Sequence, residues 1–230
     1  MTEEEWLGTD SPLAMLAFLF PKGALPKVSL RKGHLFGCAV CRRIWNLLTD
    51  VRSQQAVEYI EAVADGRNRQ RFGSGNAMLD AARDASRNAP SMTGRKAAEA
   101  AYALVVVEVE FWEVLGHVII GAMNAVAPRG PNGVTDIERY HQEIAAHTAL
   151  FRDIFGNPFR PIALDHTWQT ANVLALAHAI YEERAFDRLP ILADALEDAG
   201  CTNQDILGHC RGQGPHVRGC WVVDMVLGKE

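Results

Sequence analysis

The stretch from Ala100 to Ala127 is the most apolar part of the chain, and it constrains the fold more than any other segment. It is interrupted by three carboxylates and one imidazole: Glu108, Glu110, Glu113 and His117. Carboxylates near the centre of a bilayer cost free energy, so a membrane-spanning helix is not expected. The stretch is predicted to lie in a protein core, and no membrane association is predicted.

Residues 95–127 begin as a helical sequence, but Val105–Phe111 alternates apolar and charged residues and is rich in β-branched side chains. Such alternation is typical of a strand. A helix is favoured, because the flanks are alanine-rich and no second segment is evident with which a strand could pair. We predict a helical segment at the centre of the fold, with a short strand at 105–111 as the alternative.

The rest of the chain predicts helices separated by short turns. Ser11 followed by proline is typical of a helix start, Asp50 can cap a helix, and residues 135–138 form a capping box. The last helix is expected from His216 to Leu227. The predicted fold is all-α, an array of about eight or nine helices in one domain, residues 1–230. The turn cluster at 128–133 is the predicted sub-boundary.

The charge is divided unevenly along the chain. Residues 1–98 carry 14 Lys and Arg against 10 Asp and Glu, whereas the remainder carries 9 against 18, and the net charge is −5. Nucleic-acid binding depends on neutralising phosphates, so an acidic chain is not expected to bind nucleic acid generally. The start of the chain is acidic and its first apolar run is short, so no export signal is expected and a cytoplasmic location is predicted.

Five cysteines without an export signal are expected to be reduced thiols or metal ligands. Their spacing places thiol and imidazole groups one helical turn apart at both ends of the chain. Zinc prefers four such ligands in a tetrahedron. The predicted zinc ligands are Cys38, Cys41, His216 and Cys220, with His34, His209 and Cys210 as reserve ligands. The alternative is that the cysteines are small core residues.

A second pattern combines carboxylates with imidazoles on the helix predicted over 135–155. Its Glu-x-x-His spacing is the one that di-iron helix bundles use. Such bundles need a second motif of this kind, and the sequence has none. A metal-dependent enzyme is therefore kept as an alternative function. The candidate ligands are Glu138, His141, Glu143 and His147, with Glu110 or Glu113.

A glycine-containing loop after residue 66 carries three arginines that could bind an anion or a phosphate: Arg67, Arg69 and Arg71. A solvated loop is the plainer interpretation, because only Phe72 offers an aromatic ring for stacking on a base. A nucleic-acid-associated factor using residues 67–71 is kept as a further alternative.

Segments at both ends of the chain carry a resemblance to a known family. They are Met1–Leu7, Cys38–Trp45, Phe151–Pro161, Asp194–Cys201, His209–Arg211 and His216–Trp221. On these segments the chain resembles an uncharacterised protein family of planctomycete-type bacteria. The resemblance implies no activity. Since no catalytic motif emerges either, the chain is predicted to be a non-enzymatic helical interaction or regulatory module with a protein partner.

Overall fold

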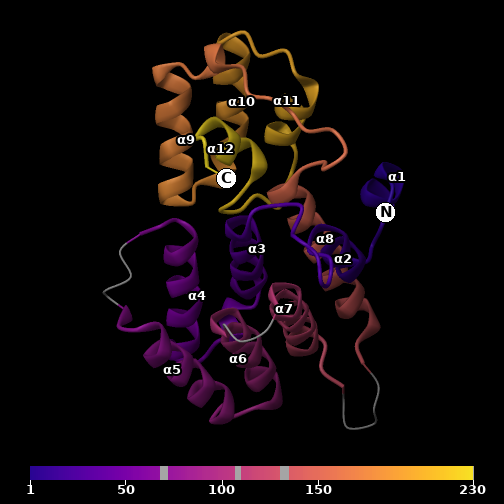
Figure 1. The fold of residues 1–230 in the computed structure, drawn as a ribbon, viewed down its shortest axis with the longest axis vertical. Helices are drawn as coiled ribbons and strands as arrows, with labels where there is room; N and C mark the ends of the chain where they lie inside the picture. The colour runs from indigo at the N-terminus through magenta and orange to yellow at the C-terminus, as the bar shows by residue number, and fades with distance from the viewer. Residues whose placement is uncertain (68–71, 107–109, 130–134, 230) are drawn as a thin grey trace. The chain divides into compact units, whose positions relative to one another are not determined.

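The computed structural model describes residues 1–67, 72–106, 110–129 and 135–229. Over these residues the chain forms twelve α-helices and no strand, apart from an isolated bridge between Arg129 and Thr135. The predicted all-α class is confirmed, with more helices than the eight or nine expected (Figure 1). The helices are α1 Glu3–Gly8, α2 Pro12–Leu19, α3 Leu30–Arg43, α4 Val51–Ala64, α5 Gly75–Arg87, α6 Met92–Val105, α7 Phe111–Val126, α8 Ile137–Phe155, α9 Ala171–Glu183, α10 Leu189–Asp198, α11 Gln204–Arg211 and α12 Trp221–Val226.

The chain divides into two compact units. The first unit holds Met1 and Glu3–Thr148, and the second holds Thr2 and the residues from Ala149 onward. The division falls inside α8, after its third turn. Most of the sub-boundary predicted at 128–133 lies outside the described residues. Among the helices described, none is long and apolar enough to span a membrane.

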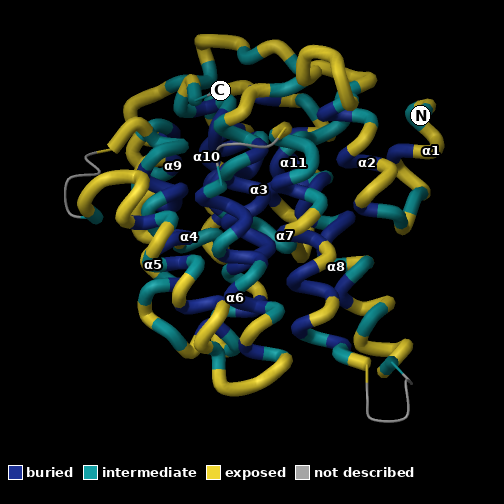
Figure 2. The backbone as a smooth tube through the Cα atoms, turned by 60° about the horizontal axis from the view of Figure 1, so that its bottom comes forward, coloured by how far each residue is buried: buried dark blue, intermediate teal, exposed yellow. Residues whose placement is uncertain are grey.

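The first unit is built around α3, α6 and α7. The buried residues of α3 form a continuous run from Leu35 to Cys41 (dark blue in Figure 2). The helices α6 and α7 pack closely, because Gly121 has no side chain: a Cβ there would lie 3.0 Å from the Cβ of Ala100. Small residues at this crossing let two backbones approach, which increases the dispersion contacts between them.

The single helical segment predicted over 95–127 is wrong. The helix α6 ends at Val105 and α7 begins at Phe111. Val106 already has an extended backbone, with φ −74° and ψ 125°, and so has Glu110, with φ −61° and ψ 140°. The break begins at Val105 and Val106, where the run of β-branched residues starts, and such residues lose rotamer freedom in a helix. The alternative strand at 105–111 falls partly on residues 107–109, outside the described residues.

The predicted helix starts are confirmed in two cases and shifted in a third. Ser11 and Asp50 cap α2 and α4 with their side chains, as predicted. The capping box predicted to begin at Thr135 is displaced by one residue. Asp136 is the cap of α8, and its carboxylate accepts a hydrogen bond of 3.1 Å from the N–H of Arg139. Each such cap contributes about 1 kcal/mol to stability.

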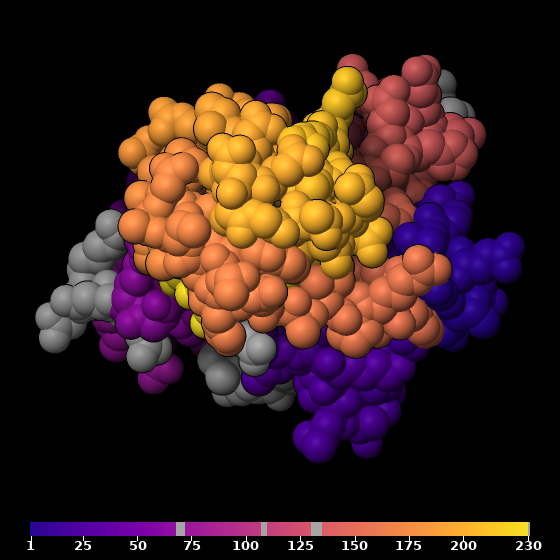
Figure 3. Space-filling model, turned by 90° about the horizontal axis from the view of Figure 1, so that it is seen from above, coloured from indigo at the N-terminus to yellow at the C-terminus, as the bar shows by residue number. Residues whose placement is uncertain are grey.

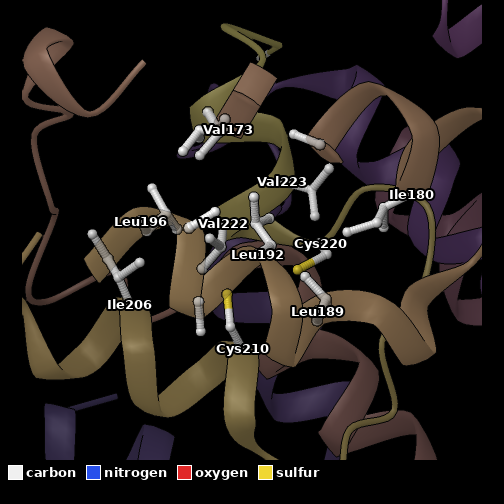
Figure 4. Close-up of a cluster of buried hydrophobic side chains, with 14 of the residues drawn as sticks. Val173, Ile180, Leu189, Leu192, Leu196, Ile206, Cys210, Cys220, Val222 and Val223 are labelled. Carbon is white, nitrogen blue, oxygen red and sulfur yellow. The ribbon is translucent and has the colours of Figure 1, made fainter. Parts of the chain in front are cut away.

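The second unit has its own apolar core between α9, α10, α11 and α12 (Figure 4). Its surface is orange to yellow in Figure 3. The fully buried side chains of this core include Val173, Ile180, Leu189, Leu192, Leu196, Ile206, Val222 and Val223, together with Cys201, Cys210 and Cys220. Each large aliphatic side chain buried in this way contributes about 1.5–3 kcal/mol. Short helices can therefore be held firmly here by tertiary packing.

The last helix predicted from His216 is also wrong at its start. It begins at Trp221, five residues later, and Cys220 is its N-terminal flanking residue. Gly219 has φ +98°, which is outside the right-handed helical region and favours glycine. Cys220 closes a turn there by donating its N–H to the carbonyl of Val217 at 2.9 Å. His216 therefore lies in a loop, and its direction is set by this loop rather than by a helix.

Candidate metal centre

Four side chains of the second unit meet at one point. They are Asp153 in the last turn of α8, His209 on α11, His216 in the following loop and Cys220 before α12. Each offers one ligand atom, and these atoms all lie within 4.8 Å of one another. This Asp-His-His-Cys group could hold a metal ion.

The distances within the group approach those of a tetrahedral site. The Oδ1 atom of Asp153 lies 2.8 Å from Nδ1 of His216 and 3.2 Å from Nε2 of His209. The same Nε2 atom lies 3.2 Å from the sulfur of Cys220. With zinc–ligand bonds of about 2.0–2.3 Å, neighbouring ligands in a tetrahedron are about 3.3–3.8 Å apart. Small shifts of these side chains would therefore admit an ion.

Backbone groups fix the orientation of two of the four side chains. The second oxygen of Asp153, Oδ2, accepts a hydrogen bond of 3.0 Å from the N–H of Val217. Nε2 of His216 lies 3.2 Å from the carbonyl oxygen of Gly212, to which it can only donate. In the neutral imidazole this donation leaves the lone pair on Nδ1, which faces Asp153. Such outer hydrogen bonds are the usual means by which proteins orient metal-binding histidines.

Asp153 is charged although it is only 3 % exposed. Burial by itself raises the pKa of this carboxyl, but hydrogen bonds and charge from His209 and His216 outweigh burial and hold the pKa below its ordinary value. For His216, burial lowers the pKa, and the contact with Asp153 raises it above its ordinary value overall. An anionic ligand is thus kept in a nearly water-free site, which favours binding of a cation there.

Cys220 is a neutral thiol in the absence of a cation. Burial, followed by the negative charge of Asp153, raises its pKa well above the ordinary value. A bound metal deprotonates a coordinating thiol, so this sulfur would become a thiolate only as a ligand. The neighbouring Cys210 is buried in the apolar core, and burial there raises its pKa to about 12.

The structure brings together only some of the predicted zinc ligands. His216, Cys220 and the reserve ligand His209 belong to the Asp-His-His-Cys group. Cys38 and Cys41 are buried on α3 in the first unit, where the Cys38 thiol donates to the carbonyl of Val57 at 3.6 Å. The convergence of this pair with His216 and Cys220 stays a prediction.

The remaining reserve ligand and Cys41 have apolar surroundings. The ring of His34 packs edge-on against Phe111 with 4.8 Å between centroids, and burial lowers its pKa. Burial also raises the pKa of Cys41 far above its ordinary value. Cys41 fits the interpretation of the cysteines as core residues, whereas His34 is only partly buried.

Sequence reasoning missed Asp153. The signal for it lies in its neighbours, since Leu150, Phe151 and Ile154 are fully buried. Asp153 is three residues from Leu150 and so shares its face of α8. A carboxylate on an apolar helix face needs a partner, and this requirement could have identified it.

The carboxylate–imidazole pattern of α8 does not assemble into a metal site in the structure. Glu143 forms a two-pronged ion pair with Arg43, at 3.0 and 2.9 Å, and its Oε1 lies 3.0 Å from Nε2 of His147. Glu138 and His141 are exposed. Within the described ranges, the Asp-His-His-Cys group is the one set of three or more such side chains close enough to share an ion.

Two further sets of candidate residues remain: the glutamates at the start of α7 and the arginines of residues 67–71. Glu110 accepts a hydrogen bond of 2.7 Å from the indole of Trp112, and Glu113 lies in the first turn of α7. Arg67 lies 3.5 Å from the carboxylate of Asp65. Arg69 and Arg71 fall outside the described residues, so anion binding by this loop stays a prediction.

No protein-family model, curated protein or solved structure matches this chain. The resemblance to a planctomycete-type family therefore stays a prediction, and the chemistry of the site rests on its own geometry.

Proposed function

We propose that this chain is a zinc-binding helical protein, in which Asp153, His209, His216 and Cys220 hold a structural ion. The observation that carries the proposal is the meeting of four ligand atoms of three chemical types within 4.8 Å. Zinc accepts oxygen, nitrogen and sulfur ligands together, and it favours four of them. Magnesium and calcium prefer oxygen ligands alone, so this donor set does not suit them.

A structural role is favoured over a catalytic one because the ligand set is closed. Catalytic zinc sites commonly keep one position open for water or substrate, whereas structural sites use four protein ligands. Asp153 and Cys220 are 3 % and 0 % exposed, which leaves little access for a substrate. The ion would connect the end of α8, helix α11 and the loop before α12.

A thiol nucleophile is not supported by the same group. In a Cys-His-Asp triad the two partners contact opposite nitrogens of the imidazole. Here Asp153 and Cys220 both face Nε2 of His209, each at 3.2 Å. Cys220 is also fully buried, with a pKa raised well above its ordinary value. A reactive cysteine would need the opposite conditions.

The wider role that we propose is a non-enzymatic interaction or regulatory module with a protein partner. The closed ligand set supports it, because no position is left for chemistry at the ion. The alternatives make different predictions. Iron or manganese in the purified protein would favour a metal-dependent enzyme, and salt-sensitive binding to mixed oligonucleotides would favour a nucleic-acid-associated factor.

The test is the metal content of the full chain purified without chelator. We expect elemental mass spectrometry to find about one zinc ion per chain. His216→Ala and Cys220→Ala should each lower the zinc content strongly, because three ligands hold the ion less tightly than four. Cys201→Ala is the matched control, since Cys201 is a buried cysteine of the same unit outside the group.

The outcomes separate the two ligand sets. Full zinc content in Cys38→Ala together with loss in Cys220→Ala supports the Asp-His-His-Cys group. Loss in Cys38→Ala would instead support the ligand set predicted from the sequence. A wild-type protein that binds no zinc, even when zinc is added, contradicts the proposal.

A further inference from the structure

Trp221 is connected to the Asp-His-His-Cys group in two ways, through the chain and through a ring contact, without being a ligand itself. It directly follows the ligand Cys220 and begins α12. Its indole ring lies 5.2 Å from the imidazole of His209, centroid to centroid, at an interplanar angle of 56°. His209 in turn contacts the ring of His216 edge-on, with 4.8 Å between centroids. The three rings form a row in which Trp221 contacts the ligand His209, and His209 contacts the ligand His216.

The indole also packs closely against Gly156, the residue that follows α8. A Cβ at this position would lie 3.2 Å from Cγ of Trp221 and 3.4 Å from its Cδ2. Gly156 has φ +62° and follows the last residue of α8, three residues after the ligand Asp153. Glycine is favoured here both by the left-handed backbone and by the contact with the indole. The row of contacts therefore runs from the end of α8 to both histidines.

His209 has more need of such support than the other ligands. The oxygens of Asp153 and the ring of His216 are oriented by backbone groups, namely the N–H of Val217 and the carbonyl of Gly212. The contacts that hold His209 inside the group are those of its Nε2 with Asp153 and Cys220, both ligands themselves. A bound ion would replace these contacts, and ring packing would then set the plane of the imidazole.

We infer that Trp221 is a positioning residue of the metal centre, which holds the imidazole of His209 in the orientation that binds zinc. The inference rests on the proposed function, because it concerns the affinity of that site. A ligand that is held in place loses less conformational freedom on binding, so its support increases affinity. Loss of a hydrogen-bonded outer partner typically lowers metal affinity by about 10–100-fold, and we expect loss of the ring contact to act in the same range.

The test compares Trp221→Phe and Trp221→Leu with wild type, using zinc competition against a chromogenic chelator. We expect affinity to fall in the order Trp, Phe, Leu, with Leu weaker than wild type by about 10–100-fold. Trp168→Phe is the matched control, since Trp168 also packs against the core of the second unit. It should leave the affinity within about twofold of wild type.

Cobalt binding distinguishes positioning from a merely structural role. Cobalt(II) in the wild-type site should show the strong visible absorption of a tetrahedral ion with a thiolate ligand. In Trp221→Leu this absorption should weaken or shift, because His209 no longer ligates in the same geometry. Gly156→Ala is the second variant, since its new Cβ displaces the indole while the tryptophan remains. Gly156→Ala should therefore also lower zinc affinity, as the Trp221 substitutions do.

Failure of the inference differs from failure of the proposed function. A wild-type protein that binds neither zinc nor cobalt overturns the proposed function, and the inference with it. If wild type binds zinc and the Trp221 variants melt at lower temperature with unchanged zinc affinity and cobalt spectrum, the inference alone is overturned. Reduced affinity in Trp168→Phe equal to that in Trp221→Phe also overturns it.

Discussion

At the scale of single residues, the partner decides what a buried carboxylate does. Helix α8 carries two of them, Glu143 and Asp153, which are 4 % and 3 % exposed. Glu143 faces one imidazole, that of His147, but also Arg43, a permanent cation that donates to both of its oxygens. Asp153 faces two imidazoles, each of which can release a proton to solvent and bind a metal ion with the freed nitrogen lone pair. The first carboxylate is therefore a structural ion pair, and the second is a candidate ligand.

Glu143→Gln should make the free energy of unfolding depend less on pH below pH 4.5. Burial alone raises the pKa of Glu143, but His147 and Arg43 outweigh it and hold the pKa at about 2, below the ordinary value of 4.5. A lowered pKa means that the stabilisation is complete above pH 4.5 and is lost as the pH falls towards 2. At pH 6 we expect the free energy of unfolding of the variant to be lower than that of wild type by roughly 1–3 kcal/mol.

Chemical denaturation between pH 6 and pH 2.5 measures this difference. It should shrink steadily below pH 4.5, whereas the control Glu138→Gln, at an exposed position of the same helix, should show little difference at any pH. A difference between wild type and Glu143→Gln that stays constant down to pH 2.5 would contradict the ion pair as its cause.

At the scale of helices, small residues decide where two of them can approach. Gly116 and Gly121 both lie in α7, but a side chain would meet different surroundings at each. At Gly116 the nearest atom to a new Cβ is Cδ2 of Leu16, at 3.9 Å, an ordinary contact. At Gly121 a new Cβ would meet three atoms of Ala100 at 3.0–3.3 Å, two of them in the backbone of α6.

Gly116→Ala should stabilise the protein, and Gly121→Ala should not. Alanine in a helix interior is favoured over glycine by about 0.5–1 kcal/mol, and Gly116→Ala should realise this gain. At position 121 overpacking against α6 costs about 1–3 kcal/mol and cancels or exceeds it. Urea denaturation of both variants gives the comparison. Equal stabilisation by the two substitutions would show that α6 and α7 do not pack as described.

At the scale of the whole molecule, the proposed zinc ion acts within one of the two compact units. Asp153, His209, His216 and Cys220 all belong to the second unit. An ion bound only by the folded chain stabilises it by about 2.7 kcal/mol when free zinc exceeds the dissociation constant 100-fold. The local effect should be largest in the segment from Gly212 to Cys220, which carries two ligands and is not helical.

Removal of zinc with a chelator should therefore loosen the second unit selectively. Hydrogen exchange measured by mass spectrometry should show faster exchange in α11, in the loop after it and in α12. Exchange in α3, which carries Cys38 and Cys41, should stay the same. Equal loss of protection at α3 would contradict a site confined to the second unit and would support the ligands predicted from the sequence.

The sequence by itself determined the all-α class and the helix starts capped by Ser11 and Asp50. These features depend on local chemistry: side-chain caps, helix propensity and the absence of a second strand candidate. It also indicated thiol and imidazole chemistry, because Cys and His close together in a chain are few and easily recognised.

Only the tertiary structure decided which residues join that group. Asp153 is 56 residues before His209 in the chain, and no local pattern connects them. The turn at Gly219 sends His216 into a loop, so its direction follows from packing and from the carbonyl of Gly212 rather than from helical periodicity. A helix period predicts which side chains share a face, whereas the meeting of two distant faces depends on how all their neighbours pack.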